Sequence, residues 1–231
     1  MLKRLALIAL LVVSSSTVLA QYDNQRKDRS PSAAGSRDTR FEASVILAYQ
    51  NGLEESSEGG SSIDVDSQLG WGISVGWNWT AKWNLSYRLV ATEPNYLATI
   101  VPDNDDPSAL PQTVEHKMSK YSHQLNATYN FSEKAFTPFV LAGIGWTKLD
   151  SNIPGGPPNT ACWWDPWWGY ICISDWETYQ TSEFTYNLGL GLRWDINNAV
   201  FTKATYSREF LKVDNGTLNF DMAILEVGLM F

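Results

Sequence analysis

Apolar and polar residues alternate one by one along eight separate stretches of this chain, and this period of two constrains the fold more than any other feature. Such alternation places side chains on opposite faces of a β-strand. The stretch 68–79 shows it most clearly, with Leu, Trp, Ile and Val on one face and Gly, Ser and Asn on the other. We therefore expect an all-β fold with strands over residues 40–50, 68–79, 83–92, 117–131, 136–148, 183–196, 199–210 and 218–231.

Eight such strands fit two architectures. A soluble sandwich or barrel would turn the apolar face inward, whereas a membrane barrel would turn it outward to lipid. Gly, Ser, Asn and Thr dominate the polar face, which suits a narrow polar interior. On the apolar face, aromatic residues gather near the strand ends, as the interfacial girdles of a membrane barrel require. The pattern favours the membrane barrel.

The connections between the strands alternate strictly in length. Residues 80–82, 132–135 and 197–198 are short turns, and residues 51–67, 93–116, 149–182 and 211–217 are long loops. In outer-membrane barrels the short turns face the periplasm and the long loops face outward. We predict an eight-stranded antiparallel up-and-down transmembrane β-barrel over residues 40–231, with four extracellular loops and periplasmic termini.

The beginning of the chain has the pattern of an export signal. Lys3 and Arg4 precede an apolar run, and small residues lead to Ala20. The run has about nine residues, far fewer than the roughly twenty that an uncleaved anchor helix needs. We expect a signal peptide over residues 1–20. Residues 21–39 are polar and lack periodicity, which predicts a flexible periplasmic lead-in.

The formal net charge is −8 and no basic patch is apparent, so we expect no nucleic-acid partner. The chain contains 11 tryptophans, yet its mean hydropathy is −0.24. After residue 20 it has no apolar run long enough for a spanning helix. Apolar residues hidden by alternation explain both facts.

The last nine residues alternate apolar side chains up to a terminal phenylalanine. With the strand pattern of residues 40–231, this end resembles the small eight-stranded outer-membrane barrels, the OmpA-, OmpX- and OmpW-like group. The resemblance implies a Gram-negative outer membrane, with its lipid and lipopolysaccharide as partners. It also implies that the barrel-assembly machinery reads Leu225, Val227, Leu229 and Phe231; the alternative is an ordinary last strand that ends in phenylalanine.

Charged residues also fall on the inward face of the expected strands. They are Glu42, Arg88, Arg193, Lys203, Glu209 and Glu226. Glu226 is expected to pair with Arg193 or Lys203 on neighbouring strands, because buried charges need partners. The cluster would be either a structural network or an ion path. An eight-stranded interior is barely wide enough for its own side chains, which favours the structural role.

The third loop holds both cysteines, Cys162 and Cys172. In an exported chain we expect a disulfide, and a metal site would need two further ligands. Aromatic residues crowd the same loop: Trp163, Trp164, Trp167, Trp168, Tyr170 and Trp176. They form either a contact surface for an extracellular protein, sugar or lipid headgroup, or a self-packed core that stiffens the loop.

Acidic clusters mark the first two loops, at Glu54, Glu55 and Glu58 and at Asp103, Asp105 and Asp106. A divalent-cation site is conceivable there, but a solvated acidic surface is the simpler interpretation. We predict no cofactor.

A hydrolase would need a serine and a histidine positioned for nucleophilic catalysis. Ser119, Ser122, His116 and His123 are close in sequence, yet parity points Ser122 inward and His123 outward. We therefore predict a non-enzymatic barrel with a structural or surface-interaction role through its loops. The alternative is a narrow, porin-like channel for small or apolar solutes.

Overall fold

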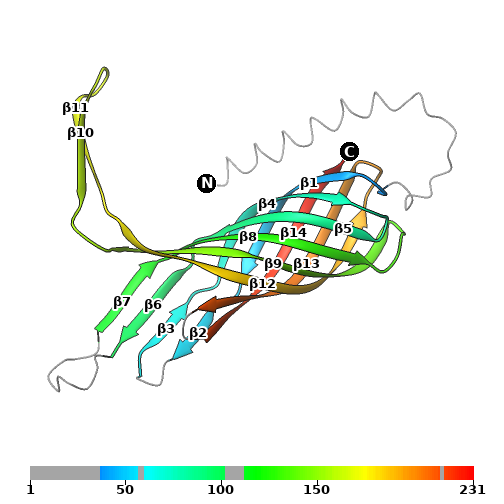
Figure 1. Ribbon diagram of the computed structural model, residues 1–231, viewed down its shortest axis with the longest axis horizontal. Helices are drawn as coiled ribbons and strands as arrows, with labels where there is room; N and C mark the ends of the chain where they lie inside the picture. Colours follow the sequence, from blue (N-terminus) through cyan, green and yellow to red (C-terminus); the bar gives the residue numbers. More distant parts are fainter. Residues whose placement is uncertain (1–36, 57–59, 102–111, 214–215) are drawn as a thin grey trace. The chain divides into compact units, whose positions relative to one another are not determined.

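The computed structural model describes residues 37–56, 60–101, 112–213 and 216–231. The expected signal peptide and nearly all of the lead-in lie outside these residues. Eight strands form a closed barrel in the order β1-β14-β13-β12-β9-β8-β5-β4 (Figure 1). Their bounds are β1 Phe41–Gln50, β4 Gln68–Asn78, β5 Trp83–Thr92, β8 Ser119–Asn130, β9 Phe136–Pro154, β12 Thr178–Asp195, β13 Val200–Val213 and β14 Gly216–Met230. In the described part, no helix is long and apolar enough to cross a membrane.

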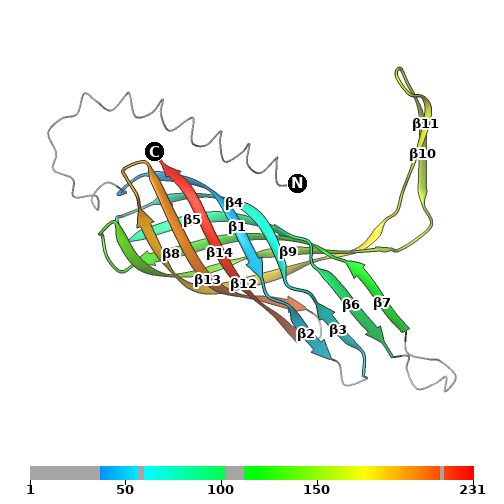
Figure 2. The same cartoon turned by 180° about the vertical axis from the view of Figure 1, so that it is seen from behind.

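The first and last strands close the barrel. Viewed from behind, β14 lies between β1 and β13, and its pairing with β1 is antiparallel (Figure 2). Phe41 and Phe231 exchange two backbone hydrogen bonds at the end of this seam. Both ends of the described chain therefore meet at the barrel end that carries the short turns. Closure confirms the predicted fold and gives the wall strands partners on both sides, which a lipid environment demands.

Apolar side chains face outward on every strand of the barrel. On β12, Leu188, Leu190 and Leu192 are exposed, whereas Asn187 and Arg193 are buried. Alternation is less regular on β9 and β13, yet these strands follow the same rule: Ile144 and Tyr206 point outward, and Phe139 points inward. This inverted arrangement is that of a lipid-facing wall around a polar interior.

Small residues on β4 bring its neighbours together inside the barrel. A Cβ atom on Gly72 would lie 2.3 Å from the Leu89 carbonyl oxygen, so a larger residue cannot be accommodated there. On the lumen side of β4, Ile46 and Ala48 of β1 pack in one cluster with Val90 of β5. The glycines of β4 thus leave room for side chains of the flanking strands β1 and β5 to pack together.

The expected loops contain more regular structure than the sequence predicted. Strands β2 (Leu53–Ser56), β3 (Ser62–Val65), β6 (Asn95–Ile100) and β7 (Gln112–Lys117) form a second sheet in the order β2-β3-β6-β7. Strands β10 (Asn159–Asp165) and β11 (Gly169–Asp175) form a hairpin, and β9 and β12 extend beyond the expected ends. Pairing satisfies the backbone polar groups of these long connections.

A small apolar core stabilises the second sheet. It contains Val65, Tyr96 and Met118, with Leu149 and Ile153 of β9 packed against it. The Tyr96 hydroxyl donates to the Ser151 carbonyl oxygen at 3.3 Å. Burial raises the pKa of Tyr96, so this hydroxyl stays protonated at neutral pH.

Candidate functional site

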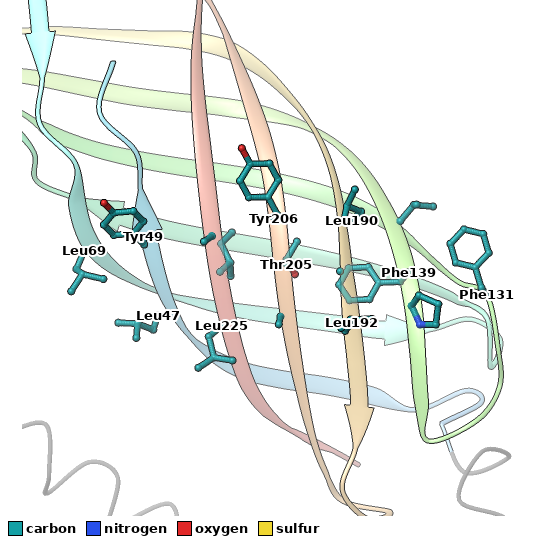
Figure 3. A pocket seen from close by; sticks show the side chains of 16 residues that line it. Leu47, Tyr49, Leu69, Phe131, Phe139, Leu190, Leu192, Thr205, Tyr206 and Leu225 are labelled. Atoms are coloured by element: carbon teal, nitrogen blue, oxygen red, sulfur yellow. The ribbon is translucent and has the colours of Figure 1, made fainter. Parts of the chain in front are cut away.

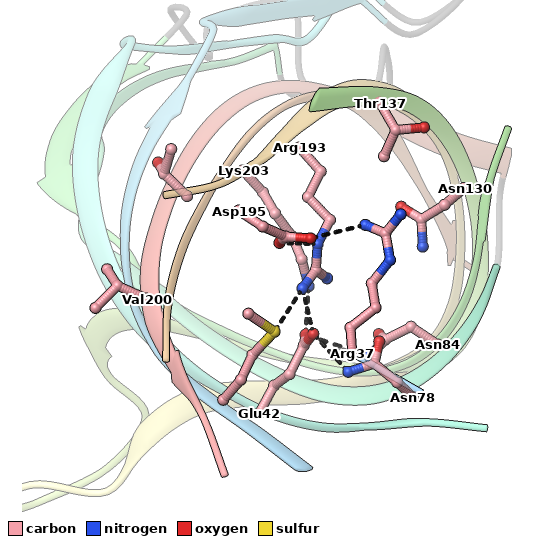
Figure 4. A network of polar contacts seen from close by, with 12 residues as sticks. Arg37, Glu42, Asn78, Asn84, Asn130, Thr137, Arg193, Asp195, Val200 and Lys203 are labelled. Atoms are coloured by element: carbon pink, nitrogen blue, oxygen red, sulfur yellow. Dashed lines mark hydrogen bonds and ion pairs between the residues drawn. The ribbon is translucent and has the colours of Figure 1, made fainter. Parts of the chain in front are cut away.

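One cluster of charges fills the lumen near the short-turn end, with Glu42 of β1 at its centre. Its carboxylate lies 2.6 Å from Arg193 Nη2 and 2.9 Å from Lys203 Nζ (Figure 4). The Asn78 amide also donates to Glu42 at 2.7 Å. Arg193 and Lys203 are directly opposite each other on β12 and β13, a destabilising position for like charges. Glu42 offsets their repulsion by pairing with both.

Arg37 and Asp195 extend this cluster. Asp195 accepts from Arg193 Nε at 2.7 Å and from Arg37 Nη1 at 3.0 Å, and Arg37 also donates to the Ser132 carbonyl oxygen. The sequence placed Arg37 in the flexible lead-in, whereas the structure buries it completely. Buried partners hold it there, and no periodicity before residue 40 signals them. Asp195 has inward parity two residues after Arg193, so that signal was available.

Glu226 pairs with Arg88 rather than with either expected partner. Arg88 Nη2 lies 2.7 Å from Glu226 Oε1, and both side chains are buried. Lys203 is directly paired with Glu226 in the sheet, but its ammonium group binds Glu42. The predicted pairing of Glu226 with Arg193 or Lys203 was wrong because it was restricted to residues on neighbouring strands. In a lumen this narrow, a long arginine on β5 reaches β14.

A second charged cluster lies toward the long-loop end. The Glu209 carboxylate accepts hydrogen bonds from Lys120 at 2.8 Å, Thr147 at 2.6 Å and Ser122 at 2.9 Å. The Lys120 ammonium group also donates to Gln50 at 3.1 Å. Glu209 was predicted from its parity, whereas Lys120 was not, although its parity is also inward. Each charge has a partner, as burial requires.

An apolar cluster lies between the two charged clusters on one side of the lumen. Along β1, the inward residues run from Glu42 through Ser44, Ile46 and Ala48 to Gln50. Glu42 and Gln50 belong to opposite clusters, and the two apolar residues between them join a buried cluster. Its members are Ile46, Ala48, Val90, Met222 and Ile224. On β13 and β8 the inward residues are polar and buried instead: Thr205, Ser207, Gln124 and Asn126. The apolar cluster therefore lines only part of the lumen, and close packing of paired side chains fills the rest.

The residues considered for catalysis are not assembled. Ser122 donates to Glu209, whereas His123 hydrogen-bonds the Tyr87 hydroxyl at 2.6 Å and stacks on Trp146. Throughout residues 37–56, 60–101, 112–213 and 216–231, no hydrogen bond joins a serine hydroxyl to a histidine.

The acidic clusters are only partly described. Glu54 and Glu55 are exposed on β2, whereas Glu58, Asp103, Asp105 and Asp106 lie outside the described residues. Within the described residues, no group of three acidic, histidine or cysteine side chains could hold a metal ion.

An apolar groove of about 750 Å³ runs over the outer wall (Figure 3). Larger side chains project around the groove: Leu47, Leu225, Tyr206 and Leu190. Between them, the small side chains of alanines on β13 and β14 form the floor of the groove. Because these side chains face away from the lumen, the groove belongs to the lipid-facing surface.

The third loop ends in a disulfide-closed hairpin. Cys162 and Cys172 are directly opposite on β10 and β11 and form the predicted disulfide. At the tip, the Asp165 carboxylate accepts hydrogen bonds from the backbone N–H groups of Trp167 and Trp168 at 2.8 and 3.0 Å. Gly169 follows with a positive φ of 77°, which completes a three-residue hairpin turn. Sequence thus fixes the shape of the tip.

Aromatic side chains of this hairpin are strongly exposed. Trp167 is 84% exposed, Trp168 79% and Trp164 67%. Tyr170 and Trp176 are also exposed, and Trp163 is less so. In the part of the chain that the structure describes, none of the four tryptophans from 163 to 168 makes a ring contact. The rings of these four tryptophans therefore do not stack on one another, which favours the contact-surface interpretation.

A family model described as the outer membrane protein beta-barrel domain matches residues 6–231. The chain belongs to this family. The family implies the outer membrane of a Gram-negative bacterium, in agreement with the lipid-facing wall. A search of curated proteins gave no match.

Solved outer-membrane proteins are similar to this chain, and the one with a TM-score above 0.5 shares its fold. OprG of Pseudomonas aeruginosa is 13% identical with a TM-score of 0.52, over 86% of this chain and 98% of that one. Ail of Yersinia pestis, solved with the heparin analogue sucrose octasulfate, is 14% identical with a TM-score of 0.49, over 84% and 99%. Neisserial surface protein A is 14% identical with a TM-score of 0.48, over 83% and 94%. At these identities the likeness is one of fold.

Proposed function

We propose that this protein is a non-enzymatic surface-interaction barrel whose third-loop hairpin contacts an extracellular partner. The hairpin's exposed tryptophans carry the proposal. Trp167 and Trp168 project from a turn whose shape is held by Asp165 and Gly169. The Cys162–Cys172 disulfide links the two strands that lead to this turn. A tip ordered in advance loses little entropy on binding, and tryptophan is the side chain most often found as a binding anchor.

The proposed orientation places the termini in the periplasm and the hairpin outside the cell. The short turns and the ends of β1 and β14 share one end of the barrel, and the long connections with β2, β3, β6, β7, β10 and β11 share the other. Outer-membrane barrels keep short turns in the periplasm.

A channel role for small or apolar solutes finds less support. Two paired charge clusters and an apolar cluster on β1, β5 and β14 occupy the lumen. Among the described residues, the lumen carboxylates of Glu42, Asp195, Glu209 and Glu226 are all paired, which leaves none of them free to bind a permeating cation. The lumen residues therefore fit the structural role better than the ion path.

Binding of intact cells to immobilised host-cell surface material, glycans and proteins tests the proposal. Cells displaying a variant with Trp163, Trp164, Trp167 and Trp168 all replaced by alanine should bind far less than cells displaying the wild type. A matched control, Thr160→Ala with Ser174→Ala, removes a hydrogen bond on the same hairpin but keeps its aromatic residues. Equal binding by wild-type and tryptophan-free cells would overturn the proposal.

A further inference from the structure

The third-loop hairpin has an unusual distribution of charge. From residue 149 to residue 192 the chain contains no Lys, Arg or His. The same segment contains the acidic residues Asp150, Asp165, Asp175, Glu177 and Glu183. The carboxylates repel phosphate- and sulfate-rich surfaces, and the segment has no Arg or Lys, the residues that mainly bind anionic ligands. Its partner must therefore be neutral, zwitterionic or cationic.

The shape of the hairpin tip further limits the kinds of partner that it can bind. Sugars and small cations are usually bound in concave sites with several converging polar groups. Here the tip is convex: Trp167 and Trp168 are almost fully exposed, and a Cβ atom on Gly169 would meet no atom within 4 Å. The one side-chain carboxylate at the tip, that of Asp165, already binds two backbone N–H groups. A convex aromatic tip matches a deformable surface better than a discrete small ligand.

Tryptophan also suits a membrane surface chemically. Its ring is apolar and its indole N–H donates a hydrogen bond, which is why tryptophan gathers at the boundary between headgroups and acyl chains. Trp164 and Tyr170 are directly opposite on β10 and β11, next to the two tip tryptophans. The hairpin can therefore insert several amphipathic rings together from a single end.

We propose that the third-loop hairpin docks on a zwitterionic phospholipid surface, as the specific form of the surface interaction proposed above. Insertion of the tip rings supplies the attraction, and the acidic residues behind the tip exclude anionic membranes. The lipopolysaccharide surface of a Gram-negative bacterium is anionic. The hairpin therefore prefers a zwitterionic membrane to the surface of the bacterium that carries it.

Vesicle capture tests this inference. The full chain is held in a non-ionic amphipol on beads, and dye-loaded vesicles of phosphatidylcholine or phosphatidylglycerol are added at low salt. The wild type should capture phosphatidylcholine vesicles, and the variant with all four tryptophans replaced should bind them about tenfold more weakly. Thr160→Ala with Ser174→Ala serves as the matched control and should bind as the wild type does.

Charge is tested separately. The wild type should capture few phosphatidylglycerol vesicles, whereas Glu177→Lys combined with Thr160→Lys should capture them well. Equal wild-type capture of both lipids, or capture unchanged by loss of the tryptophans, would overturn the inference. If intact-cell binding still depends on the tryptophans in that case, the partner is a protein or a glycan and the proposed function stands. If neither assay depends on them, both proposals fail.

Discussion

Arg88 on β5 pairs with Glu226 on β14 at 2.7 Å, although Lys203 is the residue directly opposite Glu226 in the sheet. Both side chains are buried, so the pair joins two walls of the barrel across its lumen. Replacing one member leaves the other charge buried without its partner, which costs about 3–5 kcal/mol where water cannot reach it.

Arg88→Ala should therefore lower the temperature at which the folded, fast-migrating band on SDS gels converts to the unfolded one. Arg88→Ala with Glu226→Ala should be less destabilising than Arg88→Ala alone, because no unpaired charge remains. The same comparison with Lys203→Ala and Glu226→Ala should show weaker coupling. Stronger coupling of Glu226 to Lys203 than to Arg88 would contradict the pairing.

The terminal residue gives a prediction about assembly. Phe231 is exposed on the outer wall at the end of the β1–β14 seam, and its ring stacks on Phe41. Deleting Phe231 should reduce the amount of protein inserted in the outer membrane, since the proposed assembly signal and one closing contact are lost together. Phe41→Ala, which removes the contact but keeps the signal, is the matched control. Normal insertion of the deletion variant would show that the signal is dispensable.

The alternation was sufficient to predict the eight wall strands and which of their side chains point outward. Each residue's polarity indicates on which face of its strand it lies. Long-range pairing was harder to predict. Nothing local to Glu226 indicates that Arg88, rather than Lys203, reaches it. Arg37 was missed for the same reason, since its partners are distant in the sequence: Asp195 ends β12, and Ser132 lies in the turn after β8.

The third loop was likewise predictable in part from the sequence. Its disulfide followed from composition and compartment alone, because the two cysteines had no other partner. The hairpin geometry did not, since β10 and β11 follow no strict alternation of apolar and polar residues. Asp165, Pro166 and Gly169 were the available signals for a tight turn at the tip.

The orientation of the barrel predicts where an epitope tag is accessible. A tag inserted beside Gly156, which has open space around it, should bind antibody on intact cells. A tag inserted between Asn197 and Asn198, in the short turn after β12, should bind antibody only after the outer membrane is permeabilised. The reverse pattern would place the hairpin in the periplasm and refute the proposed orientation.

The Cys162–Cys172 disulfide should stabilise the hairpin without supporting the barrel. Replacing both cysteines with serine should leave the gel-shift temperature unchanged, because the wall strands pair independently of β10 and β11. Proteolysis within residues 159–175 should become faster, because the open hairpin regains chain entropy. A lowered gel-shift temperature would show instead that the hairpin contributes to the wall.

Recording in planar bilayers tests the central claim most directly, that the protein acts through its outer hairpin and not through its lumen. Paired charges fill the lumen, and Ile46, Val90 and Ile224 pack in an apolar cluster beside them. The wild type should therefore show no stepwise conductance, whereas replacing these three residues with serine should allow water and ions to enter. Regular conductance steps from the wild-type barrel, unchanged when the four hairpin tryptophans are replaced, would contradict the account.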